Sequence, residues 1–316
     1  MTAAIETRRD AQSFPKARPG MAARTAALGE TLAALWLAGP AAVALLVLFL
    51  LPVLAVLYIA LTDWQFGAVN PHFVGLANFR EVFADPDFRA SALNTFVYML
   101  IVVPATVGLG LLVAILVESG ENLRAFYRAV HFLPYMAMLA AMAISWEGLL
   151  HPTIGLVNAV FSIFGLPTAN WLRDDSMVLA TLAVIGIWQN LGFAMVLFLA
   201  GLKAIPKDLY DAASVDGADL WFDRLRTVTM PMLGPTTMFV VIVVALNAIR
   251  VFDTVEILTQ GGPGHSSDVL LYTLYRESFE YLRTGYGAAV TIVFLVVVVT
   301  LTLIQARVMD RRVHYA

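Results

Sequence analysis

Polar side chains interrupt two long apolar segments of the chain, and these residues are the best suited to bind a small polar molecule. Gln189 and Asn190 lie in one segment, and Asn247 lies in the other. An amide group both donates and accepts hydrogen bonds, which suits the hydroxyl groups of a sugar. Trp188 and Trp146 each offer a flat apolar face against which a pyranose ring could lie. The pattern predicts a binding site for a polar solute.

The same three amides have a second interpretation. Polar groups that face hydrocarbon are costly, so amides within apolar segments turn inward, where they can also hydrogen-bond between neighbouring helices. The residue types alone leave both roles open. In both cases the side chains of Gln189, Asn190 and Asn247 should face the interior of a helix bundle.

Arg250 and Asp253 add two charges to the second segment. Residues three apart share one face of a helix, so the spacing favours a mutual ion pair. The alternative is that the planar guanidinium of Arg250 binds an anionic group of the solute, such as a phosphate or a sulfonate. The predicted substrate-binding residues are therefore Trp188, Gln189, Asn190, Asn247 and Arg250.

No residue pattern in the chain supports catalysis. The sequence has no cysteine and no Gly-x-x-x-x-Gly-Lys-Ser/Thr stretch, which excludes thiol chemistry and a phosphate-binding P-loop within the chain. The histidines lack the His-Glu-x-x-His spacing of zinc enzymes, and no Gly-x-Ser-x-Gly elbow is present. We therefore expect a chain that is not an enzyme and that holds neither a metal nor a cofactor.

The elements that must position these residues are membrane-spanning helices. Hydrophobic residues make up 60% of the sequence and charged residues 14%, whereas soluble domains have about 45–50% and about 25%. The mean hydropathy is +0.79, and the apolar residues cluster into blocks comparable to the roughly 20 residues that cross a bilayer core. A net charge of −3 gives no sign of a nucleic-acid partner. The predicted fold is an all-α, polytopic membrane protein with six spans, near Leu32–Leu61, Ala90–Val117, Ala129–Leu150, Met177–Ala200, Met232–Leu258 and Ala288–Ala306.

Lysine and arginine predict the orientation of these spans. Of the 20 basic residues, 14 fall in the two ends and in the loops after the second and fourth spans. The positive-inside rule therefore places both termini in the cytoplasm. The apolar run over 32–61 greatly exceeds the 7–15 residues of a secretory signal, so we expect no cleavage there. Residues 1–30 are expected to form a cytoplasmic tail and residues 31–316 a transmembrane domain.

The segment over 204–231 lies between the fourth and fifth spans and is too long and too patterned for a simple turn. Pro206 suits the entry to a helix, and Asp208 and Asp211 suit its positively polarised start. Gly217 suits the end of this helix. The segment therefore predicts a helical hairpin on the cytoplasmic face of the membrane.

The hairpin should continue with a second short helix over 218–226, and Pro231 should fall in the first turn of the fifth span. At this point the chain resembles the EAA loop of ABC importer permeases. The residues that carry the resemblance are Asp211-Ala212-Ala213, Gly217 and Val228-Thr229-Met230-Pro231. In that family the loop is the coupling helix, which sits in a groove of the ATPase subunit and carries its closure to the spans.

Two departures from the family pattern are visible. Asp211 stands where the family usually has Glu, and the stretch from Gly217 to Val228 is one residue longer than usual. The first departure keeps the charge, and the second affects the register of the second short helix. The resemblance assigns the coupling role to Asp211, Ala212, Ala213, Gly217 and Pro231.

Further motifs, in the same order along the chain, are similar to the maltose-type carbohydrate permeases. They are Thr62-Asp63-Trp64, Phe73 to Phe79, Asn94-Thr95, Phe132-Leu133-Pro134, Trp188 to Phe193, Phe252-Asp253 and Leu258-Thr259-Gln260-Gly261-Gly262-Pro263. The last of these resembles the first permease of a two-permease system.

The resemblance implies a type I ABC importer permease that moves a sugar or a sugar-like solute from the periplasm to the cytoplasm. Its implied partners are a second permease, two ATPase subunits that bind ATP and Mg²⁺, and a periplasmic solute-binding protein. The implied location is the inner (cytoplasmic) membrane, in contact with lipid. The alternative is a gradient-driven secondary transporter of small polar solutes, a class expected to carry internal repeats and buried ion-coupling carboxylates.

Overall fold

The computed structural model describes residues 36–120, 123–218 and 220–312. Within these ranges the secondary structure is helical, apart from one antiparallel bridge between Thr62 and Phe73. The predicted all-α fold is confirmed. The predicted tail over 1–30 and both chain ends lie outside the described residues.

The chain divides into two compact units, residues 1–55 and residues 56–316. The described part of the first unit is an apolar helix that includes the π-helical turn η1 (Leu46–Leu50). The helix continues as α2 (Leu51–Ala60). Together these residues supply the first span, Trp36–Ala60.

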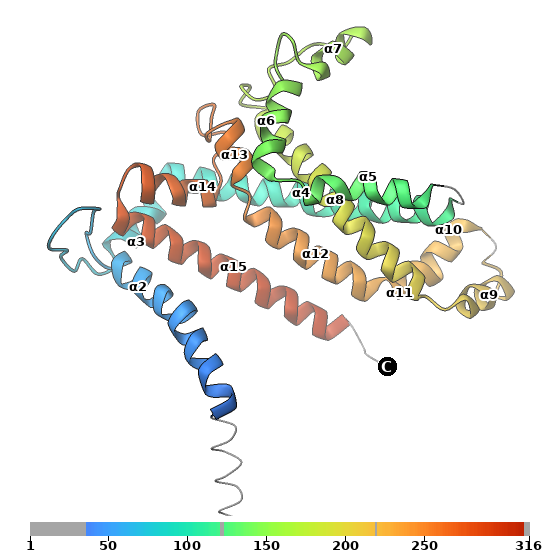
Figure 1. Ribbon diagram of the computed structural model, residues 1–316, viewed down its shortest axis with the longest axis horizontal. Helices are drawn as coiled ribbons and strands as arrows, with labels where there is room; N and C mark the ends of the chain where they lie inside the picture. Colours follow the sequence, from blue (N-terminus) through green and yellow to red (C-terminus); the bar gives the residue numbers. More distant parts are fainter. Residues whose placement is uncertain (1–35, 121–122, 219, 313–316) are drawn as a thin grey trace, which may run out of the picture. The chain divides into compact units, whose positions relative to one another are not determined.

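Five helical segments in the described part of the chain are long and apolar enough to cross a bilayer, and a bent pair of helices brings the total to six. The bent pair consists of α5 (Arg124–Met136) and α6 (Leu139–Leu149), which meet at 101° (Figure 1). The third predicted span is therefore broken in the middle. The other spans are α4 (Pro86–Ser119), α8 (Val178–Ala204), α12 (Gly234–Ile249) with α13 (Asp253–Leu258), and α15 (Thr284–Arg312).

The core of the second unit forms where α8 packs along α4, with α12 against both (Figure 1). Its side chains are aliphatic and aromatic, as expected for helices whose faces turn away from lipid. The most deeply buried of them include Val102, Leu182, Met195, Phe198, Val240 and Val244.

Two glycines let these helices approach one another closely. A Cβ atom on Gly192 of α8 would lie 1.9 Å from the carbonyl oxygen of His131 in α5. A Cβ atom on Gly110 of α4 would lie 2.7 Å from the Cβ atom of Ala194. Small residues at such contacts are a common device of membrane helix packing. They hold α4, α5 and α8 together as one packed group.

A buried ion pair anchors the segment between α13 and the next helix, α14 (Leu270–Tyr275). The side chain of Asp268 is fully buried, and its Oδ2 atom lies 2.9 Å from Nη2 of Arg276. Nη1 of Arg276 donates a second hydrogen bond to Oδ1 of Asp268 at 3.1 Å. Arg276 begins the π-helical turn η3 (Arg276–Glu280), so the pair ties this turn to the preceding loop.

The amide of Asn94 in α4 joins the same loop. Its Nδ2 group donates to the carbonyl oxygens of His265 at 3.1 Å and of Asp268 at 3.0 Å. The hydroxyl of Thr95 accepts a hydrogen bond from the backbone N–H of Leu270 at 2.9 Å. The loop that contains the Gly-Gly-Pro motif is thus fastened to α4 by the adjacent residues Asn94 and Thr95.

Candidate functional site

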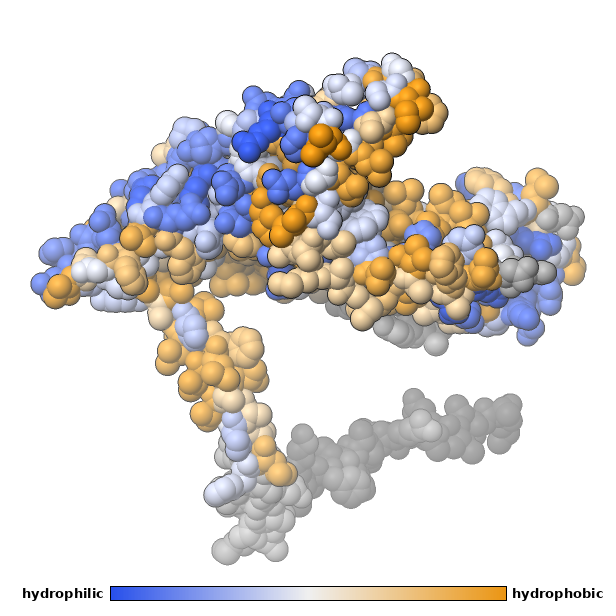
Figure 2. Space-filling view, turned by 45° about the horizontal axis from the view of Figure 1, so that its top comes forward, coloured by the Kyte–Doolittle hydropathy of each residue, from blue (hydrophilic) through white to orange (hydrophobic). Residues whose placement is uncertain are grey.

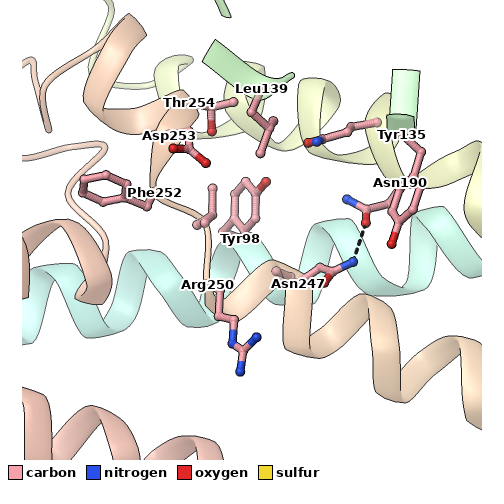
Figure 3. A pocket seen from close by; sticks show the side chains of 12 residues that line it. Tyr98, Tyr135, Leu139, Asn190, Asn247, Arg250, Phe252, Asp253 and Thr254 are labelled. Carbon is pink, nitrogen blue, oxygen red and sulfur yellow. Dashed lines mark hydrogen bonds between the residues drawn. The ribbon is translucent and has the colours of Figure 1, made fainter. Parts of the chain in front are cut away.

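A cavity of about 250 Å³ lies where the two broken spans meet α8 (Figure 3). The break between α5 and α6 supplies Tyr135 and Leu139 to its wall. The break between α12 and α13 supplies the irregular residues 250–252. Non-helical backbone within a membrane span is tolerated where it lines a cavity, and discontinuous helices form the solute sites of many transporters. The position of this cavity makes it the candidate solute site.

All three predicted amides line this cavity, and two of them are hydrogen-bonded to each other. Nδ2 of Asn247 donates to Oδ1 of Asn190 at 3.0 Å, and Nδ2 of Asn190 donates to the carbonyl oxygen of Gly186 at 2.9 Å. Gln189 also lines the cavity, and its amide makes no hydrogen bond with another described side chain or backbone group. Asn190 and Asn247 thus link α8 to α12, as the packing interpretation predicts. The amide of Gln189 has no hydrogen-bond partner among the described residues, and solute binding by these amides stays a prediction.

The predicted ion pair between Arg250 and Asp253 is absent from the described residues. Both residues line the cavity and are exposed, and their side chains point in opposite directions (Figure 3). The prediction assumed a continuous helix, but α12 ends at Ile249 and α13 begins at Asp253. The unwound residues between them turn the two side chains apart. Arg250 also points away from the linked amides of Asn190 and Asn247.

Trp188 lies outside the set of cavity-lining residues, so the structure separates it from the other four predicted residues. Its ring instead packs edge-on against Trp146 of α6, with ring centroids 5.3 Å apart. Trp188 and Asn190 are two positions apart, which on a helix of 3.6 residues per turn means about 200° of rotation. A side chain at position 188 therefore faces away from the wall that Asn190 lines.

Three hydroxyl groups in the cavity wall were not predicted from the sequence. They belong to Tyr98 of α4, Tyr135 of α5 and Thr254 of α13. Tyr135 is held by stacking on Phe193, with ring centroids 4.8 Å apart. In the sequence Tyr98 and Tyr135 lie within apolar runs and Thr254 directly follows Asp253, and tyrosine and threonine also serve as ordinary packing residues at such positions. No local signal distinguishes the two cases.

The predicted hairpin after α8 begins with α9 (Lys207–Val215), which Pro206 precedes. Gly217 has a φ angle of +90°, a conformation that favours glycine because it has no Cβ atom. The backbone N–H of Ala218 then donates to the carbonyl oxygen of Ala213 at 2.9 Å, which closes the end of the helix. Asp211 and Ala212 are exposed on α9.

The second helix of the hairpin differs in register from the prediction. It begins at α10 (Trp221–Arg224) and continues through the π-helical turn η2 (Leu225–Thr229) into α11 (Met230–Met232). Pro231 consequently lies in α11, and Pro235 occupies the first turn of the span α12 instead. The hydroxyls of Tyr210 in α9 and Thr229 in η2 lie 3.1 Å apart and join the two helices of the hairpin.

Comparison with known proteins identifies the family. Residues 82–315 match the family described as "Binding-protein-dependent transport system inner membrane component". The chain is 33% identical over 272 residues to the trehalose/maltose transport system permease protein MalF of Thermococcus litoralis, a match that covers 85% of this chain and 90% of that protein. It is 31% identical over 284 residues to the sn-glycerol-3-phosphate transport system permease protein UgpA of Agrobacterium fabrum, with 88% and 95% covered.

The fold also matches a solved structure. A chain in the crystal structure of a bacterial alginate ABC transporter, in complex with an alginate pentasaccharide-bound periplasmic protein, has a TM-score of 0.77 with this chain at 20% identity. The match covers 91% of this chain and 96% of that one, so the type I permease fold extends over nearly the full length. The chain belongs to the binding-protein-dependent transport system inner membrane components, the permease family of ABC importers.

Proposed function

We propose that this permease moves a sugar or a sugar-like solute from the periplasm to the cytoplasm through the cavity between its two broken spans. The observation that carries the proposal is the chemistry of the cavity wall. It combines the amides of Gln189, Asn190 and Asn247 with the hydroxyls of Tyr98 and Tyr135. These groups donate and accept hydrogen bonds, which suits a polyhydroxylated solute. Arg250 and Asp253 add one charge of each sign to the same wall. The relatives named for trehalose, maltose and sn-glycerol 3-phosphate support the same solute class.

The energy for transport comes, in this proposal, from two ATPase subunits that bind ATP and Mg²⁺. The sequence has no P-loop, so nucleotide binding in the P-loop manner needs a separate chain. A second, related permease completes the pathway, and a periplasmic protein delivers the solute. The exposed side of α9, with Asp211 and Ala212, contacts the ATPase in the cytoplasm. Both chain termini lie on the same side of the membrane as α9, in agreement with the positive-inside rule.

The assembly is the first testable part of the proposal. We expect the chain to purify as a stable complex with a second permease and two ATPase copies. In proteoliposomes the complex should transport solute only with ATP, Mg²⁺ and the binding protein present. Uptake by the isolated chain without ATP would instead indicate a secondary transporter. Binding-protein-dependent stimulation of ATP hydrolysis is the accompanying measurement.

The role of the cavity is tested best at Gln189, because its amide has no partner among the described residues. Gln189→Met keeps the length of the side chain but removes its hydrogen bonds. We expect the transport rate to fall about 5–10-fold, the cost of roughly one hydrogen bond to the solute, while assembly and basal ATP hydrolysis stay unchanged. Asn247→Leu should lower transport further, because it also leaves Oδ1 of Asn190 without its donor.

The control for these variants is Asn170→Leu, at an exposed position in the loop before α8. It makes the same type of change away from the cavity, so transport should remain at the wild-type rate. If Gln189→Met transports normally while Asn247→Leu lowers the thermal stability of the complex, the amides serve helix packing alone. The cavity would then no longer be the proposed solute site.

A further inference from the structure

The loop between α6 and α8 carries an exposed apolar surface that the transport pathway does not use. Its short helix, α7 (Leu156–Ile163), lies at the end of α8 opposite the hairpin (Figure 1). The exposed side chains on and beside it are apolar, with Ile154 83%, Ile163 79% and Phe164 75% exposed. We call this surface the α7 patch; its members are Ile154, Leu156, Val160, Ile163 and Phe164.

The α7 patch is held in place by a buried amide on the opposite side of the helix. Nδ2 of Asn158 donates to the carbonyl oxygens of Pro152 and Ala169, each at 2.9 Å. Its Oδ1 atom accepts from the indole N–H of Trp171 at 2.9 Å and from the backbone N–H of Ala169 at 3.2 Å. These bonds satisfy the amide of Asn158 internally and fix the helix with its apolar side outward. The exposure of the patch is therefore built into the loop.

The composition of this loop indicates what covers the α7 patch. From Gly148 to Leu172 the sequence has no Asp, Glu, Lys or Arg, and the charged residues of this loop, Arg173, Asp174 and Asp175, follow just before α8. The other two loops on this side of the membrane also carry several charged residues. Asp63, Arg80 and Glu81 lie in one of those loops, and Asp268 lies in the other. An interface with a soluble protein usually has a polar rim, whereas the charged residues of this loop are confined to positions 173–175, outside the stretch that forms the α7 patch. Figure 2 shows the apolar side chains gathered at the tip of the arm that α6 and α7 form.

A groove behind α7 continues the same apolar surface. It has a volume of about 330 Å³ and is lined by Trp146 of α6, Phe161 of α7, Trp171 and the first half of α8. Val184, which lies on the membrane-spanning helix α8, is 57% exposed within this groove. An apolar groove that opens beside a span is suited to an acyl chain of the surrounding lipid. The groove and the α7 patch thus point to one kind of partner.

We infer that the α7 patch lies within the bilayer leaflet opposite the hairpin, where lipid acyl chains cover it. The helix lies within this leaflet, with its apolar side against the acyl chains. Trp146 and Trp171 line the adjoining groove and offer flat apolar faces to the same acyl chains. The arm then steadies the outer end of α8 against lipid.

A spin label can test this placement because the chain has no cysteine of its own. Ile163→Cys is labelled with a nitroxide in the complete complex, with cysteine-free partner subunits, in phosphatidylcholine vesicles. Collisions with oxygen report acyl-chain exposure, and collisions with a water-soluble nickel chelate report water exposure. The matched control is Val69→Cys, an equally exposed apolar residue in a charged loop on the same side. The ratio of oxygen to nickel collisions should be about tenfold higher at position 163 than at position 69, since apolar groups partition from water.

Two outcomes would overturn the inference. A ratio equal to that at position 69 would place the α7 patch in water. An immobilised label shielded from both oxygen and nickel would mean that another protein surface covers the patch. Phe164→Cys provides the same measurement if the first variant does not assemble. The readout does not involve transport, so it remains informative even if the cavity is not the solute site.

Discussion

Arg276→Met should lower the free energy of unfolding of the permease by about 3–5 kcal/mol, the range expected when one partner of a buried ion pair is removed. The variant leaves the carboxylate of Asp268, which is fully buried, without its main counter-charge. Burial by itself lowers the pKa of Arg276, but the Asp268 carboxylate and its hydrogen bonds outweigh burial and raise that pKa. The guanidinium therefore remains charged in the folded protein. Thermal unfolding of the purified complex measures the loss.

A double variant separates the ion pair from general packing. Asp268→Asn combined with Arg276→Met removes both charges, so it should destabilise the protein by less than the sum of the two single changes. The control is Arg173→Met at an exposed arginine, which should change stability by less than about 0.5 kcal/mol. If Arg276→Met matched this control, the pair would not anchor the loop.

Gly217→Pro in the hairpin should lower the number of solute molecules transported per ATP hydrolysed by at least about tenfold, within the usual range of coupling energies between sites. Gly217 has a φ angle of +90°, and proline is confined to about −65°. Proline also removes the N–H that donates to the carbonyl oxygen of Ser214 at 3.2 Å. The end of α9 must therefore rearrange, while the spans have no reason to unfold. The measurement pairs solute uptake with phosphate release in the same proteoliposomes.

Gly217→Asn is the matched control, because asparagine tolerates positive φ better than other residues with a Cβ atom. It should keep most of the coupling. Asp211→Lys, which reverses an exposed charge on α9, should uncouple in the same direction, whereas Asp211→Glu should not. If both Gly217→Pro and Asp211→Lys kept wild-type coupling, the hairpin would not transmit the closure of the ATPase to the spans.

The spans and the first helix of the hairpin were predictable because their signals are local. Apolar runs, basic loops and the Pro206–Gly217 frame of α9 all lie within short windows of sequence. The breaks at 137–138 and at 250–252 were not predictable, because the residues there also fit continuous helices. These breaks depend on contacts with neighbouring helices, and a local sequence pattern carries no information about such contacts.

The candidate site shows the same division between local and tertiary information. The three amides were found because polar residues stand out in apolar segments, and all three line the cavity. Trp188 was placed with them by proximity in sequence, but the rotation of α8 turns it toward Trp146. The ion pair of Arg250 with Asp253 failed because the helix that would form it is broken. The direction in which a side chain faces and the continuity of a helix both depend on tertiary contacts.

The sharp turn between α5 and α6 sets how deep the cavity lies below the outer membrane surface. α5 has 13 residues, so it rises about 20 Å at about 1.5 Å per residue. Because α6 turns away at 101°, it adds almost nothing to that height. For α5 directed along the bilayer normal from the hairpin side, a hydrocarbon core about 30 Å thick leaves at least about 10 Å between the end of α5 and the opposite surface. A solute that enters from that surface covers only this remaining depth before it reaches Tyr135, so the permeation path to the cavity is much shorter than the bilayer is thick.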